Sequence, residues 1–257
     1  MDIGTTVQVD SFEEKWAQTN ALKKLRQNIG LFGKTMFPTA LNKEVPPFHH
    51  EIYKSLSDET LKRVLIAAPR GTAKSTVTSL ILPLHKIAFK SSDRDLFIVI
   101  ISESQTQSIN FLSRIKYHLE NSTNFQQMFG DYGPTTAKRW TNNDIVLANG
   151  ARIVAVGTGQ RVRGFIEGDT RPNLIIVDDY ESELNASTQE GRAKNRKWIT
   201  EAVIPSLSDE GRIVMIGTVI SEDCFLYWAK DSPAWETLWF SIYNDDGKSI
   251  WEERFPE

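Results

Sequence analysis

The sequence predicts an α/β fold with three layers, in which helices cover both faces of a mostly parallel central sheet. Near-continuous apolar runs rich in Val and Ile have the composition of strands buried on both faces. These runs occupy residues 63–68, 96–102, 173–179 and 212–217. Amphipathic, helix-like patterns separate them, at residues 75–90, 104–120 and 187–203. Regular alternation of strand and helix indicates parallel strands joined by right-handed crossovers. Pro83 lies inside the first helical pattern and is expected to kink or end that helix.

A β-hairpin insert interrupts this alternation. Residues 144–157, DIVLANGARIVAVG, alternate in polarity around Asn149-Gly150, which is a strong signal for a two-residue hairpin loop. We expect an N-terminal helical segment over 1–44, an α/β core over 45–243, and the start of a linker over 244–257. The last of these boundaries follows one more strand-like run and a Pro-containing end in TLWFSIYNDDGKSIWEERFPE (237–257).

Bulk properties exclude several classes of protein. The chain has 257 residues, a formal net charge of −3 and one cysteine, Cys224. A single cysteine excludes an intramolecular disulfide. No apolar run approaches the roughly 20 residues that a membrane span needs, so we expect no membrane association. A protein that binds nucleic acid tightly on its own is usually basic, so any contact with nucleic acid is expected to use a local patch.

The turn after the first apolar run resembles a phosphate-binding loop. Residues 65–76 read LIAAPRGTAKST, where the pattern G-x-x-x-x-G-K-[ST] has alanine at both glycine positions, Ala68 and Ala73. Backbone N–H groups bind the phosphates in such a loop, so alanine is tolerated if Ala73 adopts helical backbone angles. Gly71 is expected at the tightest point of the turn. Lys74 is predicted to contact the β- and γ-phosphates, and the Ser75 hydroxyl is predicted to bind Mg²⁺.

An acidic strand end strengthens this interpretation. Residues 174–181, LIIVDDYE, form an apolar run that ends in carboxylates. Asp178 is the predicted Mg²⁺ residue. The next acid would polarise the attacking water; adjacency favours Asp179, and Glu181 remains an alternative. Taken singly, the loop is also compatible with a capped helix start and the strand end with an Asp-rich turn. Together they predict a site for ATP and Mg²⁺.

With these motifs in this order, the chain resembles the ATPase domain of tailed-phage terminase large subunits, a P-loop domain with a RecA-like core. The matching segments are PPFHHEIYKSL (46–56), APRGTAKS (68–75), IVIISESQTQS (98–108), the run 163–181 and VMIGT (214–218). The resemblance implies that His49 abuts adenine, that Arg70 is the arginine of a Walker A variant, and that Gly217 and Thr218 sense the γ-phosphate. The predicted nucleotide-binding residues are therefore His49, Pro69, Arg70, Gly71, Thr72, Ala73, Lys74, Ser75, Thr76, Gly217 and Thr218.

The resemblance also implies partners and a place of action. It implies translocation of double-stranded DNA, a homo-oligomeric ring of five copies, and a portal and small terminase subunit as partners, in the host cytoplasm at the procapsid. A trans arginine can complete the site in such rings, and Arg163 is the candidate; its alternative is a simple surface arginine. Arg70 is the candidate for a contact to the γ-phosphate in cis. Family members also carry a nuclease domain with clustered carboxylates, which this sequence lacks, so we expect no nuclease activity.

Other functions fit parts of the same pattern. A RecA-like helicase shares the core chemistry but normally brings a second such domain. A small-molecule kinase needs an acceptor pocket and a lid. A nucleotide-binding switch with little turnover is favoured by the two alanines in the loop. The basic stretch GRAKNRKW (191–198) is either a contact to DNA phosphates or a solvated helix face with Trp198 on its apolar side.

Overall fold

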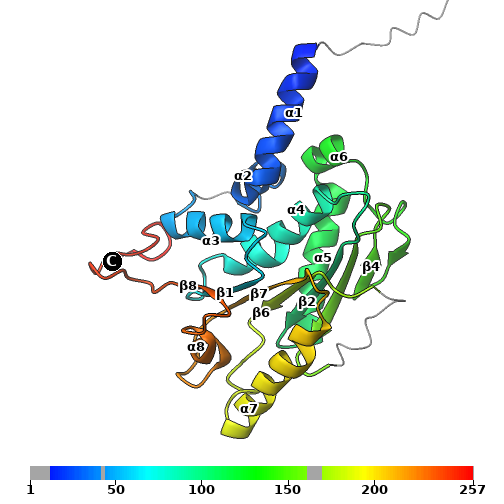
Figure 1. Cartoon of the computed structure of the whole chain (residues 1–257). Helices are drawn as coiled ribbons and strands as arrows, with labels where there is room; N and C mark the ends of the chain where they lie inside the picture. The colour runs from blue at the N-terminus through cyan, green and yellow to red at the C-terminus, as the bar shows by residue number, and fades with distance from the viewer. Residues whose placement is uncertain (1–11, 42–43, 161–169, 257) are drawn as a thin grey trace, which may run out of the picture.

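The computed structural model describes residues 12–41, 44–160 and 170–256. Its central sheet is covered by helices on both faces, which confirms the predicted three-layer α/β fold (Figure 1). The strand order is β3-β4-β5-β2-β6-β7-β1-β8. Six of these strands, from β5 to β8 in that order, are parallel, whereas β3 and β4 run antiparallel. The strands span Arg63–Ala67 (β1), Phe97–Ser102 (β2), Arg139–Trp140 (β3), Asp144–Val146 (β4), Arg152–Gly157 (β5), Leu174–Asp178 (β6), Arg212–Gly217 (β7) and Glu236–Trp239 (β8).

Alternate residues of each central strand point to opposite faces of the sheet. In β2, Ile98 and Ile100 belong to one hydrophobic cluster, whereas Val99 and Ile101 belong to the other. Since both faces are covered, every residue of β2, β6 and β7 is buried. This double burial explains why the strands read as continuous apolar runs in the sequence.

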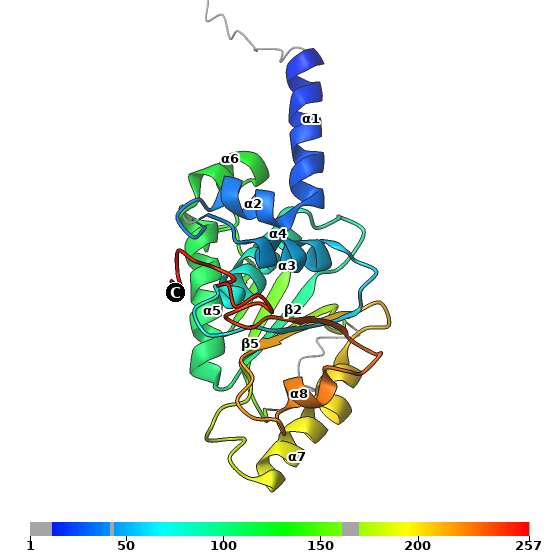
Figure 2. The ribbon, with the colours of Figure 1, turned by 90° about the vertical axis from the view of Figure 1, so that its left-hand side faces the viewer.

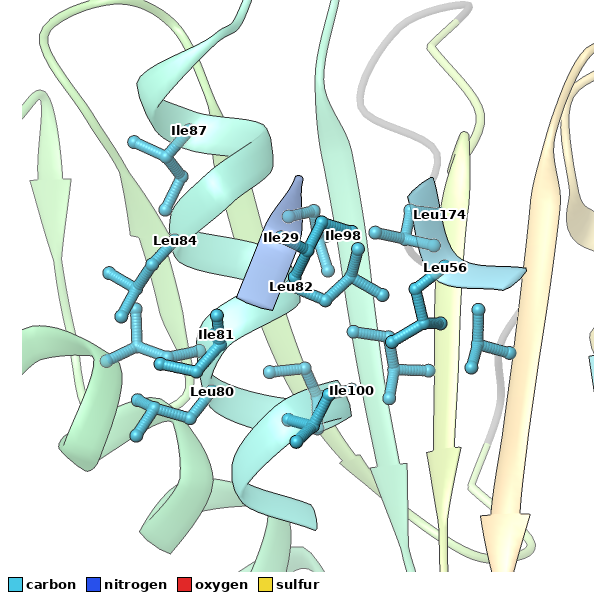
Figure 3. Packing of buried hydrophobic residues seen from close by; sticks show 14 of the residues in the cluster. Ile29, Leu56, Leu80, Ile81, Leu82, Leu84, Ile87, Ile98, Ile100 and Leu174 are labelled. Carbon is cyan, nitrogen blue, oxygen red and sulfur yellow. The ribbon is translucent and has the colours of Figure 1, made fainter. Parts of the chain in front are cut away.

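Most helices lie on one face of the sheet. This layer contains α2 (Ile29–Met36), α3 (Pro47–Ser57), the π-helical turn η1 (Thr76–Ile81), α4 (Leu82–Ala88), α5 (Gln105–Asn121) and α6 (Thr123–Phe129). Figure 3 shows the apolar side chains of η1 and α4, from Leu80 to Ile87, beside Ile98 and Ile100 of β2. The helix α1 (Phe12–Gln27) extends away from this layer (Figures 1 and 2).

The opposite face carries a smaller helical layer. It contains α7 (Gln189–Trp198), a π-helical turn η3 (Ile199–Val203), a 3₁₀ turn η4 (Ile204–Ser206) and α8 (Phe225–Ala229). Ile199, Val203 and Phe225 are buried against the sheet from this side. No helix in the described part of the chain is both long and apolar enough to cross a membrane.

The helix after the phosphate-binding loop changes type at Pro83, as the sequence predicts. The π-helical turn Thr76–Ile81 ends immediately before α4, whose second residue is Pro83. Proline has no N–H and its ring disturbs the preceding turn, so a regular α-helix cannot pass through it undisturbed. The wider π turn absorbs the mismatch, and five of its six residues, from Val77 to Ile81, are buried.

The predicted hairpin forms, but its loop and its place differ from the expectation. The N–H of Leu147 donates to Ala151 O and the N–H of Gly150 donates to Leu147 O, which closes a loop of three residues. Gly150 adopts φ +81, whereas Asn149 has no positive φ. A two-residue type I′ loop requires positive φ at both central residues, so the chain forms the three-residue loop that ends in a left-handed glycine. The second strand of the hairpin, β5, also pairs in parallel with β2. The hairpin therefore extends the main sheet instead of standing apart from it.

The last residues return to the body of the protein. After β8, Tyr243 and Ser249 form an isolated antiparallel bridge. Trp251 is buried, with its ring 5.4 Å from that of His49 in α3. Figure 2 shows this C-terminal stretch in red beside α3. Residues predicted as the start of a linker thus pack against the N-terminal part of the core.

Candidate nucleotide-binding site

A cavity of about 430 Å³ lies beside the turn that follows β1. Its lining comes from segments far apart in the sequence. These are Ala40, Leu41, Glu44 and Val45 before α3, His49 and Tyr53 of α3, Arg70, Gly71 and Ala73 to Thr76 of the loop, Asp179 after β6, and Trp251 and Arg254 near the C-terminus. Because β1 and β6 are parallel, their carboxyl ends deliver the loop and the acidic turn to the same edge of the sheet.

The loop backbone forms a concave turn with two residues in the left-handed region. Gly71 has φ +84, as expected for the tightest point, and Ala73 has φ +58. The expectation of helical angles at Ala73 is therefore wrong. The helix begins only at Lys74, and the residue before it must reverse the chain so that the loop amides turn inward, which is the geometry of an anion-binding nest. Alanine at such an angle costs roughly 1–2 kcal/mol relative to its favoured region.

Side chains from inside and outside the loop hold this turn. The Thr72 hydroxyl donates to Pro69 O at 2.8 Å, and His49 Nε2 donates to Thr72 O at 2.7 Å. Burial lowers the pKa of His49, which keeps the ring neutral near pH 7. His49 thus lines the cavity and also supports the loop from α3.

Lys74 connects the loop to two other strand ends. It is almost fully buried, and its Nζ donates to Thr218 Oγ1 at 3.0 Å and lies 3.7 Å from Asp179 Oδ2. The N–H of Thr218 donates to Asp179 Oδ1 at 2.9 Å. Lys74, Asp179 and Thr218 therefore form one polar network at the inner end of the cavity.

Asp178 lies directly behind Ser75. Its Oδ1 accepts a hydrogen bond from the Ser75 hydroxyl at 3.0 Å, and its Oδ2 accepts one from the Ser79 hydroxyl at 2.5 Å. The side chain is fully buried, and this desolvation raises the pKa of Asp178 to about 7. A hydroxyl and a carboxylate side by side are hard oxygen donors suited to Mg²⁺, which commonly keeps most of its water and phosphate ligands. The described residues contain no cluster of three or more His, Cys, Asp or Glu that would bind a metal alone.

The two candidate bases occupy different places. Asp179 lines the cavity and has φ +44, an angle that Asp tolerates better than most residues. Glu181 does not line the cavity; its Oε2 accepts a hydrogen bond from the N–H of Phe225 at 2.7 Å, at the start of α8. Burial raises the pKa of Glu181. The geometry therefore favours Asp179 over Glu181 as the carboxylate that faces the cavity.

The remaining predicted residues are placed as follows. Arg70 and Thr76 line the cavity, whereas Pro69, Thr72, Gly217 and Thr218 stand behind it and support it. A Cβ at Gly217 would lie 2.8 Å from Leu226 Cδ1 and 3.2 Å from Asp179 Oδ1, so a side chain there would displace the acidic turn. Arg163 lies outside the described residues.

Sequence motifs did not predict several residues of the cavity, among them Ala40, Leu41, Glu44 and Val45 before α3, and Tyr53, Trp251 and Arg254. Tyr53 lies one helical turn after His49, and its buried hydroxyl has no hydrogen-bond partner among the described residues. Burial raises the pKa of Tyr53 to about 12. The i, i+4 spacing from His49 would have indicated Tyr53. Trp251 and Arg254 carried no comparable signal, because only the tertiary fold brings the C-terminal segment to the loop.

The basic stretch on α7 lies on the other face of the sheet. Arg192 donates to the Ala186 carbonyl at 2.9 Å and to Asp223 at 3.2 Å, and the guanidinium of Arg196 lies 4.7 Å from the ring centre of Trp228. Lys194 and Lys197 are exposed. Trp198 packs against the apolar cluster, as expected. Lys197 Nζ also lies 3.8 Å from Glu201 Oε2, so three of the four basic side chains, Arg192, Arg196 and Lys197, have partners within the protein.

Comparison with known proteins places this geometry in a fold class. No family model and no curated protein matches the chain. Among solved structures, the large terminase ATPase domain of Thermus phage P74-26 matches with a TM-score of 0.56 and 15% identity, over 85% of this chain and 88% of that one. The large terminase of bacteriophage HK97 matches with a TM-score of 0.53 and 11% identity, over 79% of this chain and 40% of that one. S. cerevisiae dbp5 bound to gle1 and ip6 matches with a TM-score of 0.52 and 13% identity, over 85% of this chain and 52% of that one.

The parallel sheet, the loop after β1 and the acidic turn after β6 define the fold as that of a P-loop nucleoside triphosphatase. Within this class the chain resembles the ATPase domains of phage large terminases, as the order of its motifs predicts.

Proposed function

We propose that this chain binds Mg·ATP in the cavity beside the phosphate-binding loop and hydrolyses it as the motor domain of a terminase large subunit, which drives viral double-stranded DNA into procapsids. The observation that carries the proposal is the convergence of Lys74, Ser75 and Asp179 on one cavity, with Asp178 directly behind Ser75. The likeness in fold to two phage large terminases supports the assignment to packaging.

Each residue of the cavity has a physical role in this proposal. The loop amides and Lys74 would bind the β- and γ-phosphates. Ser75 and Asp178 would hold Mg²⁺, which would supply positive charge beside the phosphates. Lys74 is close to Asp179 when no phosphate is present. A phosphate that attracts Lys74 would therefore release the Asp179 carboxylate to polarise a water molecule. Arg70 lines the same cavity and is placed to contact the γ-phosphate in cis.

The proposal extends to partners through the resemblance. It includes double-stranded DNA, a ring of five copies in which Arg163 completes a neighbour's site, and a portal and small terminase subunit, in the host cytoplasm at the procapsid. A nucleotide-binding switch with little turnover is the second candidate. Alanine in the left-handed region at position 73 and the contact between Lys74 and Asp179 favour it.

Mg·ATP hydrolysis per chain, measured over a wide range of protein concentration with and without double-stranded DNA, tests the proposal. We expect turnover that DNA stimulates and that Lys74→Ala abolishes. A specific rate that rises with concentration supports completion of the site by a neighbour, whereas a flat rate supports Arg70 acting in cis. Binding of ATP without turnover under all these conditions would favour the switch. A rate that Lys74→Ala leaves unchanged would refute the site.

A further inference from the structure

The C-terminal segment Ile250–Pro256 contributes a cation to the nucleotide cavity that no motif predicts. Arg254 lines the cavity together with Arg70 and Lys74. Its neighbours Glu252 and Glu253 line a different hollow, between α3 and the stretch after β8. Only the arginine of the triplet Glu-Glu-Arg therefore faces the phosphate-binding loop.

Arg254 lies close to the apex of that loop. A Cβ built on Gly71 would be 3.4 Å from Arg254 Nε and 3.5 Å from the ring of Phe255. Gly71 is the residue with φ +84 at the tightest point of the turn, where the backbone amides converge. The guanidinium is therefore within reach of an anion that those amides bind.

Packing of the segment fixes this position. Trp251 is buried, with ring centres 5.4 Å from His49 and 6.2 Å from Phe48. The N–H groups of Arg254 and Phe255 both donate to Trp251 O, which closes a turn over the anchored tryptophan. The guanidinium of Arg254 lies 5.7 Å from the centre of the Trp251 ring. An anchored turn thus presents the arginine to the cavity.

Among the described residues, two carboxylates line the cavity, Glu44 and Asp179. Asp179 is beside Lys74, and within residues 12–41, 44–160 and 170–256 neither Arg70 nor Arg254 forms an ion pair with a carboxylate. Two unpaired guanidinium groups beside a nest of amides are complementary to a polyphosphate, and guanidinium is well suited to bidentate phosphate binding.

We propose that Arg254 is a nucleotide-binding residue that contacts the phosphates from the C-terminal side of the cavity. This inference rests on the proposed function, because it takes the ligand to be a nucleoside di- or triphosphate. It makes the anchored segment after β8 part of the binding site, so that nucleotide binding is coupled to this segment through one charged contact.

The test compares ADP with adenosine in competition against a fluorescent ADP analogue, using the full chain. The variants are Arg254→Gln, Arg254→Lys and, as a matched control in the same exposed stretch, Lys248→Gln, whose position lines neither cavity. Loss of a charge-assisted contact is expected to weaken ADP binding about tenfold in Arg254→Gln. The affinity of Arg254→Gln for adenosine should be unchanged. The affinity of Arg254→Lys for ADP should lie between those of the wild type and Arg254→Gln, and that of Lys248→Gln should equal the wild-type value.

The alternatives give distinct results. Equal loss for ADP and adenosine would mean that Arg254 only supports the fold, and would overturn the inference. Unchanged ADP binding in Arg254→Gln, together with loss in Lys74→Ala, would overturn the inference and leave the proposed function standing. A wild-type chain that binds no ADP would overturn both. Nucleotide-dependent protection of residues 250–256 in hydrogen exchange, lost in Arg254→Gln but kept in Lys248→Gln, would support the inference independently.

Discussion

Asp178 is a carboxyl group without exposed surface, and its protonation should be visible in the stability of the protein. Burial raises its pKa to about 7, whereas an Asp in an unfolded chain titrates near about 3.9. Below about pH 4 both states bind the proton. Between about pH 4 and 7 the folded state holds it and the unfolded state does not, so stability falls as pH rises; above pH 7 the penalty is constant.

The variant Asp178→Asn removes this penalty while it keeps the size of the side chain. The free energy of unfolding of Asp178→Asn minus that of the wild type should therefore increase as the pH is raised from 4.5 to 8, by up to about 4 kcal/mol. Urea unfolding at several pH values measures the difference, with the exposed Asp209→Asn as control. A difference that does not change with pH would contradict the burial of an ionisable group at this position.

The two acids of the turn after β6 should differ in catalysis. Asp179 lines the cavity, whereas the Glu181 carboxylate is held by the amide of Phe225. A general base typically contributes 10²–10⁴-fold to a rate. We expect Asp179→Asn to lower kcat at least about 100-fold and Glu181→Gln to lower it less than about tenfold. Steady-state ATPase kinetics decide between them, and the reverse order of effects would identify Glu181 as the base.

At the scale of elements, local patterns predicted the strands and helices well because both sheet faces are buried. The strands β1, β2, β6 and β7 fall within one or two residues of the predicted runs. The acidic turn and the loop were also predictable, since parallel strands place their carboxyl ends at one edge. Chain reversals were less predictable: Ala73 adopts a left-handed angle that its residue type disfavours, because the surrounding fold imposes it.

Long-range contacts account for the rest. The packing of Trp251 on His49 and the approach of Arg254 to Gly71 join residues about 180 to 200 positions apart. No periodicity or spacing within either segment encodes such a contact. The same holds for α7, where charge composition favoured a solvated face over a DNA contact without excluding the latter. The structure shows internal partners for Arg192 and Arg196.

The basic helix α7 should therefore respond unevenly to loss of charge. Arg192 donates to the Ala186 carbonyl and pairs with Asp223, so Arg192→Met should lower the free energy of unfolding by about 1 kcal/mol. Lys194 is exposed on the same helix, and Lys194→Met should change it by less than about 0.5 kcal/mol. Denaturant unfolding of both variants tests this, and equal effects would show that the contacts of Arg192 contribute nothing.

At the scale of the whole molecule, the cavity joins four distant parts of the chain. The stretch before α3, the phosphate-binding loop, the turn after β6 and the C-terminal segment each contribute a wall. A ligand that touches all four must be released before any of them unfolds, so its binding free energy adds to the stability of the entire domain.

This linkage predicts a large thermal shift with Mg·ADP. At a concentration 100 times its Kd, a ligand stabilises the folded state by about 2.7 kcal/mol, which corresponds to roughly 5–10 °C in Tm for a domain of this size. Thermal unfolding followed by circular dichroism measures the shift. Lys74→Ala should abolish it, because this side chain connects the loop to Thr218 and Asp179 and supplies the charge for the phosphates. An equal shift in the wild type and in Lys74→Ala would place the nucleotide elsewhere on the molecule, whereas a shift that is lost in the variant would place it in the cavity beside Lys74, where its binding stabilises the folded domain.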